Sequence, residues 1–534
     1  MEVPSTYVFI LAACCLAELF VGRFRRRHPD LPSFWTTLVL CFFRPWAAVA
    51  IVNLVVRVLG NIPLNRLTYP FYANAWLLPR ASFVTYLREV LGMEGARIWL
   101  PYATVIALLI VAAAFHVCKS RHANASAGSA RNIVMTLLGL YLASVAFFIS
   151  LASVPKGFFG DKGQQSSFLD PWQEAGTTML YADYYIRPRP KDYLRDFHHL
   201  QNRMDLIIHA KSHPPMASLF VRWIGQLAGA DTTWSRKAYR DPVVKLRYAI
   251  GQTAVSALNI LLIFAIGAAM FDRRTGLFAS VLWVLAPSVT SYATFAPDMN
   301  YALFFNGALL FTWLTATSST WRRAMVYALP LGLCFAMLVL MNFSWCIVTT
   351  DFAVFLLLVA LRERRGWRDF ALRAAPALTV MTLAAGYVIV HYGIRYFTIY
   401  QNSVNFVAPF YTHKSFTHML VSLVGGQVEW LFLIGPAACS LFFMFLCGRG
   451  IGEKYPLQRL FAIVLLAVFA LPVLFGPPCL KHEVARCWIW MASVPIVLAA
   501  RFCLDRAGPL ACSAVAASSA ATAILLRVSL VFLS

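Results

Sequence analysis

Apolar runs of about 20 residues follow one another along nearly the whole 534-residue chain. Each run is long enough to cross a bilayer as a helix, and lipid cannot satisfy the backbone groups of an open strand. Hydrophobic residues make up 60% of the chain and charged residues only 13%. The ten-residue alternation that is typical of membrane barrels is absent. The sequence therefore predicts an all-α polytopic membrane protein.

The apolar runs predict about 14 transmembrane helices, if each run of about 20 residues spans the bilayer once. The expected spans are residues 5–22, 36–57, 98–117, 132–153, 247–271, 276–291, 300–318, 325–341, 345–361, 371–392, 417–446, 459–475, 485–503 and 508–532. Of these, 36–57 is the weakest, because it contains Arg44 and Arg57.

The formal net charge of +23 comes largely from short loops between these runs. Lysine and arginine in short loops are typical of the cytoplasmic side of a membrane protein, so we do not expect nucleic-acid binding. With the predicted spans, one side receives seven basic clusters: Arg23–Arg27, Lys119–Arg131, Arg273–Arg274, Arg322–Arg323, Arg362–Arg373, Arg449–Arg459 and Arg501–Arg506. We predict that this side faces the cytoplasm.

One long polar segment, residues 154–246, interrupts the apolar pattern and falls on the opposite, outer side. It carries a large share of the acidic and histidine residues, which suggests that the chemistry occurs there. Within it, Pro214–Leu227 is apolar enough for an amphipathic helix lying on the membrane, and the two prolines suit a helix start. A polar linker follows residue 120, so we expect an extension at 1–120 and a catalytic module at 121–534.

Polar side chains from distant segments meet on the predicted outer face. A carboxylate, a histidine and several cations at a water–lipid boundary could bind a lipid phosphate and remove the proton of an acceptor hydroxyl. The candidate catalytic residues are Asp170, Glu174 and His213, and the candidate substrate-binding residues are Asp298, Lys481, His482, Glu483 and Arg486.

Each candidate also has a structural interpretation. Asp170 can cap a helix, and Asp298 stands near a helix start, where the helix dipole favours an acid. Glu483 and Arg486 are spaced as an ordinary helical ion pair. Asp161, Glu174 and Asp183 are alternatives to Asp170 as the catalytic acid. The sequence has no metal-ligand motif; no cofactor is required, and a divalent metal remains an option without sequence support.

Three stretches resemble motifs of the GT-C superfamily of membrane glycosyltransferases. They are LDPWQE at 169–174, followed by SHPPM at 212–216; APD at 296–298; and KHEVARCW at 481–488. The resemblance extends over residues 132–503 and leaves the first 120 residues outside it. It rests on the order of the motifs and on their common side of the membrane.

The resemblance implies an enzyme that takes a sugar from a polyprenyl-phosphate donor and passes it to a hydroxyl of a glycan, lipid or protein. Asp170 would accept the proton, and Arg486, with Lys481 and His213, would neutralise the phosphate leaving group. Its location would be the bacterial plasma membrane, with the active site facing the periplasm and lipids around it. A transporter or lipid flippase is the main alternative, and a glycan polymerase or ligase is the third interpretation.

Overall fold

The computed structural model describes residues 94–119, 128–154, 190–203, 213–229, 242–294, 298–407, 430–431, 433–448, 451–475 and 489–529. Within these ranges every regular element is a helix, and seven helices are long and apolar enough to cross a membrane. The predicted all-helical membrane fold is therefore confirmed for this part of the chain. The total of about 14 spans stays a prediction, and spans 5–22 and 36–57 lie outside the described residues.

The described helices follow the predicted spans closely. Those in predicted spans are α5 (Glu94–Lys119), α6 (Gly128–Ala152), α11 (Pro242–Ala257), α12 (Asn259–Met270), α13 (Arg273–Val284), α14 (Pro287–Tyr292), α15 (Asp298–Thr317), α16 (Trp321–Met341), α17 (Trp345–Arg362), α18 (Trp367–His391), α21 (Pro436–Cys447), α23 (Pro456–Phe475), the 3₁₀ helix η5 (Ile489–Ala492), α26 (Ser493–Arg506) and α27 (Pro509–Ser529). The others are α8 (Pro190–Arg203), α10 (Pro215–Leu227), α19 (Tyr396–Val407) and α22 (Ile451–Lys454).

Within the described residues, the predicted spans 247–271 and 276–291 are each divided into two α-helices. The run 247–271 contains α11 and α12, which meet at Leu258. The run 276–291 contains α13 and α14, because Ala286 has an extended backbone and Pro287 begins the next helix. A residue before proline avoids the helical conformation, and proline lacks the N–H that would continue the first helix.

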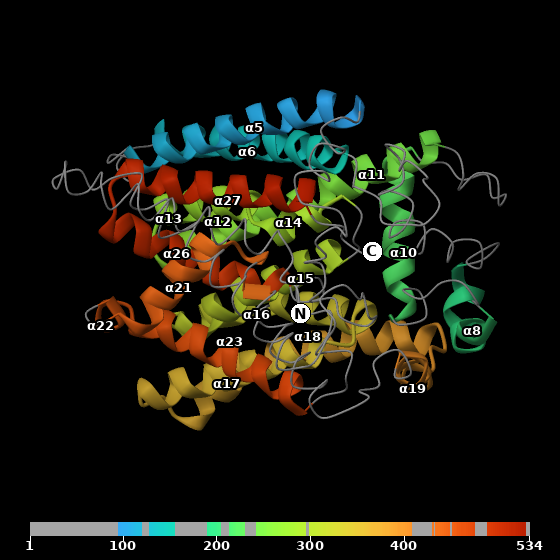
Figure 1. Cartoon of the computed structure of the whole chain (residues 1–534). Coiled ribbons are helices and arrows are strands. Elements are labelled where there is room, and N and C mark those ends of the chain that lie inside the picture. Colours follow the sequence, from blue (N-terminus) through green and yellow to red (C-terminus); the bar gives the residue numbers. More distant parts are fainter. Residues whose placement is uncertain are drawn as a thin grey trace, which may run out of the picture.

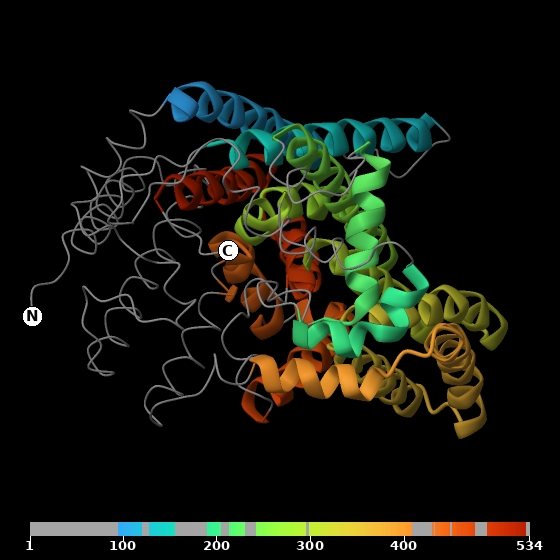
Figure 2. The ribbon, with the colours of Figure 1, turned by 90° about the vertical axis from the view of Figure 1, so that its right-hand side faces the viewer.

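The longer helices lie side by side along one direction, and α10 crosses them at one end of the bundle (Figure 1). Helices α8 and α19 lie at the same end, and α22 lies at the opposite one. We call these the α10 end and the α22 end. Figure 2 shows the α10 end, with α8 and α19 beside each other. Helix α5 packs against α6, α13 and α27, and the predicted boundary at residue 120 stays a prediction.

Close packing between neighbouring helices depends on small residues. A side chain at Gly267 of α12 would place its Cβ 2.7 Å from Cα of Gly276 in α13. Small residues allow the backbones of membrane helices to approach this closely, because lipid supplies no hydrophobic force to press larger surfaces together. Further into the bundle, the rings of Trp313, Phe355 and Phe461 pack together and join α15, α17 and α23.

Buried arginines satisfy the carbonyl groups at the carboxyl ends of helices. Arg527 of α27, 3% exposed, donates to the carbonyl oxygens of Ala152 and Val154 at the end of α6. Arg373 of α18, 2% exposed, donates to the last carbonyls of α15 and pairs with Asp369 at 2.7 Å. The last carbonyls of a helix have no intrahelical partner, so a donor from another helix locks the two together.

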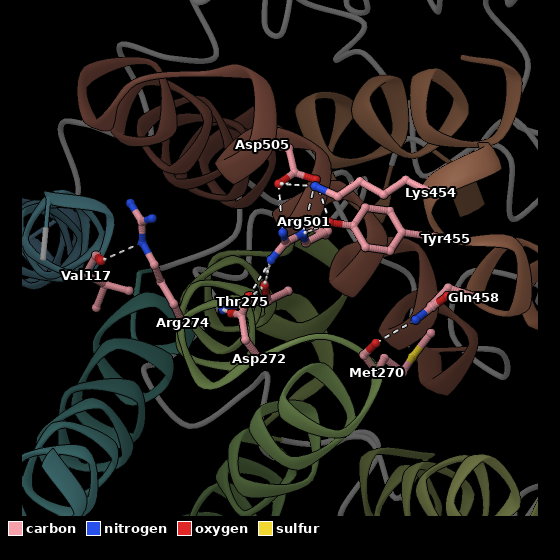
Figure 3. Close-up of polar contacts among 10 residues, drawn as sticks. All are labelled: Val117, Met270, Asp272, Arg274, Thr275, Lys454, Tyr455, Gln458, Arg501 and Asp505. Carbon is pink, nitrogen blue, oxygen red and sulfur yellow. Dashed lines mark hydrogen bonds and ion pairs between the residues drawn. The ribbon is translucent and has the colours of Figure 1, made fainter. Parts of the chain in front are cut away.

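The α22 end is held by a network centred on Arg501 of α26 (Figure 3). Arg501 donates to Asp272, whose other oxygen accepts the Thr275 backbone N–H at 2.7 Å and caps α13. It also donates to Asp505 at 2.8 Å and to the Tyr455 hydroxyl at 2.9 Å. The guanidinium therefore connects α13, α26 and the α22–α23 region.

Near this network, Arg274 and Gln458 bond to two further helix ends (Figure 3). Arg274 donates to the Val117 carbonyl of α5 at 3.3 Å, and Gln458 donates to the Met270 carbonyl of α12 at 2.7 Å. Arg274, Lys454 and Arg501 come from three basic clusters that we predicted to share one side, and they lie together here. The assignment of this side to the cytoplasm stays a prediction.

We expect Arg501→Met to lower the thermal unfolding midpoint of the purified protein in detergent, because it leaves Asp272 and Asp505 without their shared donor. Each lost bond to a charged group should cost about 1.5–3 kcal/mol. Arg506→Met is the control, since Arg506 is exposed on the same helix. Equal midpoints for the two variants would contradict the central role of Arg501.

Candidate functional site

The candidate site lies at the amino end of α15. Asp298 is the first residue of this helix and only 7% exposed, and Tyr301, one turn later, is 1% exposed. The amino end of a helix has a positive potential, which favours a carboxylate there or an anionic ligand nearby. Two buried residues at the start of α15 thus provide an acid and an aromatic ring at the α10 end.

His213 reaches this helix from a segment far away in the sequence. The His213 and Tyr301 rings have centroids 5.3 Å apart with an angle of 32° between their planes. His213 stands directly before Pro214, which caps α10, and Pro215 begins the helix without needing a backbone donor. The structure therefore brings His213 and the first turn of α15, including Asp298, into one region.

Helix α10 is held against the bundle along its length, which fixes where His213 can lie. The Phe220 ring packs edge-on against Phe304 of α15, with centroids 5.6 Å apart. A Cβ at Gly251 of α11 would lie 2.8 Å from Cβ of Ala228, so α10 crosses α11 closely. At the carboxyl end, the Gly229 carbonyl accepts a 2.7 Å hydrogen bond from Arg247.

Six of the eight predicted site residues lie outside the described residues: Asp170, Glu174, Lys481, His482, Glu483 and Arg486. So do the alternatives Asp161 and Asp183. The chain enters the described part again at Ile489, and the Trp490 ring stacks on Phe305 of α15 with centroids 4.3 Å apart. The roles predicted for these six residues stay predictions.

Sequence reasoning missed a buried network of amides beneath Asp298. Asn300 donates to Gln252 of α11 at 2.8 Å, and Asn306 donates to Asn259 of α12 at 2.8 Å. All four side chains are 0% exposed. Amides in otherwise apolar runs were the available signal, since a polar group inside a membrane bundle needs a partner.

A second polar contact at the α10 end joins α8 to α19. Gln201 donates to the Ser403 hydroxyl at 3.1 Å, and Asn402 donates to the His198 carbonyl at 3.2 Å. Next to these bonds, an apolar cluster is formed by Tyr193, Leu194, Phe197, Ile394 and Ile399. The two helices therefore form one layer across the end of the bundle.

The imidazole of His198 lies inside this layer and is 7% exposed as a residue. Burial, together with the neighbouring charges of His199 and Arg395, lowers the pKa of His198 below its usual value. The folded protein thus favours the neutral ring. Above the unfolded pKa of about 6.5 both states are neutral, and below it the unfolded state gains a proton that the folded state resists.

We therefore expect α8 to separate from α19 more readily as the pH falls below about 6.5. Hydrogen exchange of the α8 amides, corrected for the intrinsic rate at each pH, should speed up between pH 7.5 and pH 5.5. His198→Phe should remove this acid effect, and His199→Asn should keep most of it, because burial is the largest cause of the lowered pKa of His198 and His199 is exposed. An unchanged acid effect in His198→Phe would assign it to another group.

The described residues contain no group of three or more histidine, cysteine or acidic side chains that could hold a metal ion. Most of the predicted site residues lie outside these ranges, and the expectation that no cofactor is required stays a prediction.

Comparison with known proteins gives a remote structural similarity. No protein-family model matches the chain, and no curated protein sequence matches it. Among solved structures, the chain is similar to the crystal structure of the Archaeoglobus fulgidus oligosaccharyltransferase in complex with Zn and sulfate, with 13% identity and a TM-score of 0.34. The match covers 71% of this chain and 53% of that enzyme, so it spans about half of the enzyme's length.

Proposed function

We propose that this protein is a membrane glycosyltransferase that moves a sugar from a polyprenyl-phosphate donor to an acceptor hydroxyl at the α10 end. The proposal is carried by the approach of His213 to the amino end of α15, which begins with Asp298. These residues belong to two of the three stretches that resemble GT-C motifs. Their meeting at one end of a membrane bundle is what a site for a lipid-linked substrate requires.

In the proposed reaction, the acceptor oxygen attacks the anomeric carbon as the bond from that carbon to the phosphate oxygen breaks. Asp170 takes the proton of the acceptor hydroxyl, and the polyprenyl phosphate leaves as an anion. Arg486, Lys481 and His213 neutralise this anion, for which arginine is well suited because its guanidinium binds phosphate through two parallel bonds. Asp298, Glu483 and His482 complete the substrate-binding surface, and Glu174 is a second acid in the loop.

Helix α10 offers a surface at which a lipid-linked donor could bind. It crosses the ends of the spans (Figure 1). It buries Ala217, Val221 and Ile224, while Trp223 and Leu227 are 50% and 66% exposed. A helix with exposed tryptophan and leucine at this position is typical of the membrane interface. We infer that the α10 end faces the periplasm of a bacterial inner membrane.

The test measures sugar transfer by the purified protein from a panel of polyprenyl-phosphate sugars, with a broad mixture of acceptors. Asp170→Asn should lower kcat about 100-fold or more, the usual range for loss of a general base. His213→Gln and Asp298→Asn should also lower transfer. Asp196→Asn is the matched control, because Asp196 is an exposed carboxylate that pairs with Arg195 on α8.

Full activity of Asp170→Asn would keep the reaction class and move the base to Asp161 or Glu174. Wild-type protein that is folded yet transfers no sugar from any donor would contradict the proposal.

Transport is the second candidate, and Asp351 favours it. This residue lies in α17, is 0% exposed, and neither carboxyl oxygen has a hydrogen-bond partner among the described residues. Acidic residues inside membrane spans often mark ion or substrate paths. Should sugar transfer be absent, flux into vesicles by wild-type protein and by Asp351→Asn would be the measurement to make.

A further inference from the structure

The rotation of α15 about its axis decides which residues face His213. The helix buries apolar side chains on nearly every side, among them Met299, Phe305, Leu309 and Trp313. Hydrogen bonds depend on direction, whereas apolar attraction does not, so the buried polar contacts of α15 define its rotation more sharply than its apolar side chains do. A shift by one residue turns the helix by about 100°, which would carry Tyr301 away from His213.

Asn300 provides a contact that depends on rotation. Its amide donates to the Gln252 carbonyl oxygen at 2.8 Å. That oxygen also accepts the Tyr248 hydroxyl at 3.3 Å, and the Gln252 amide donates to the Ser256 hydroxyl at 3.3 Å. Gln252 is therefore held from both sides by its own helix and presents a fixed acceptor to α15.

Asn259 provides a second such contact on α12. Its amide donates to the Met299 carbonyl at 3.2 Å and to the Ser256 carbonyl at 3.0 Å. Its side-chain oxygen accepts the Asn306 amide at 2.8 Å. One residue of α12 thus holds α15 both in its first turn and two turns later.

We propose that Gln252 and Asn259 are positioning residues that set the rotation of α15, so that Tyr301 packs against His213 and Asp298 stands at the site. Any other rotation would leave these buried amides without partners, which apolar surroundings make costly. The rotational role is a property of the fold, and its consequence for catalysis rests on the proposed function.

The experiment follows the contact itself, independently of turnover. His213→Cys and Tyr301→Cys are introduced together into the full chain, and a short bis-methanethiosulfonate reagent links them in detergent. The yield is measured by mass spectrometry of the linked peptides. Gln252→Leu should lower this yield about tenfold, since the lost partner of a buried amide is worth roughly that factor. Thr253→Val is the control, because Thr253 is equally buried and, among the described residues, its hydroxyl bonds to Ala249 of its own helix and not to α15.

The double variant Gln252→Leu with Asn300→Leu separates a loss of protein stability from a change in the rotation of α15. Removal of both partners leaves no unsatisfied amide between these two positions, so this variant should fold better than Gln252→Leu alone. We expect its linking yield to stay below that of the wild type, because the Asn259 contacts then act without those of Gln252. A yield restored to that of the wild type would overturn the proposal.

Sugar transfer by Gln252→Leu and Thr253→Val, with His213 and Tyr301 intact, then tests the catalytic consequence separately. A fall in kcat with little change in KM for Gln252→Leu supports the link from rotation to catalysis. Unchanged transfer with a low linking yield would contradict the role of the His213–Tyr301 region in the reaction, while the rotational role would stand.

Discussion

Backbone carbonyl groups at helix ends must find donors, and inside a membrane protein those donors come from other helices. Arg274, Arg373 and Arg527 each reach the carboxyl end of a different helix, and Gln458 does so for α12. Because each bond joins two elements, the ends of the bundle behave as crosslinked surfaces. The position of the candidate site depends on this, since the α10 end can hold a defined geometry only if its helices neither slide nor tilt.

Polar contacts within the apolar interior also join helices to one another, in addition to the bonds at the helix ends. The side chains of Gln252 and Asn259 form hydrogen bonds with the first turn of α15, and α10 crosses α11 closely at Gly251. The site therefore rests on two rigid supports that meet where His213 faces Tyr301. The proposed polyprenyl-phosphate donor would present a charged group at the membrane boundary, and such a support would let protein charges act on it without reorganising.

Much of the helical architecture could be predicted from the apolar runs, because run length alone decides whether a helix can cross a bilayer. The breaks were harder to predict. The break at Ala286 had a local signal in Pro287, whereas the division at Leu258 had none as strong. There the Asn259 side chain bonds the Ser256 carbonyl and reaches across to α15, so the partner across the interface takes part in the geometry.

By itself the sequence determined that the chain forms apolar helices, and counting the spans predicted one side for His213 and Asp298. That inference needs only the number of predicted spans between the two residues, because an even number of crossings returns the chain to the same side of the membrane. Tertiary structure decided that His213 meets Tyr301, that α10 lies across the bundle, and that Asn300 finds Gln252. Sequence could not show these contacts, because they join residues on distant helices, and the apolar pattern of a helix does not specify which buried amide pairs with which.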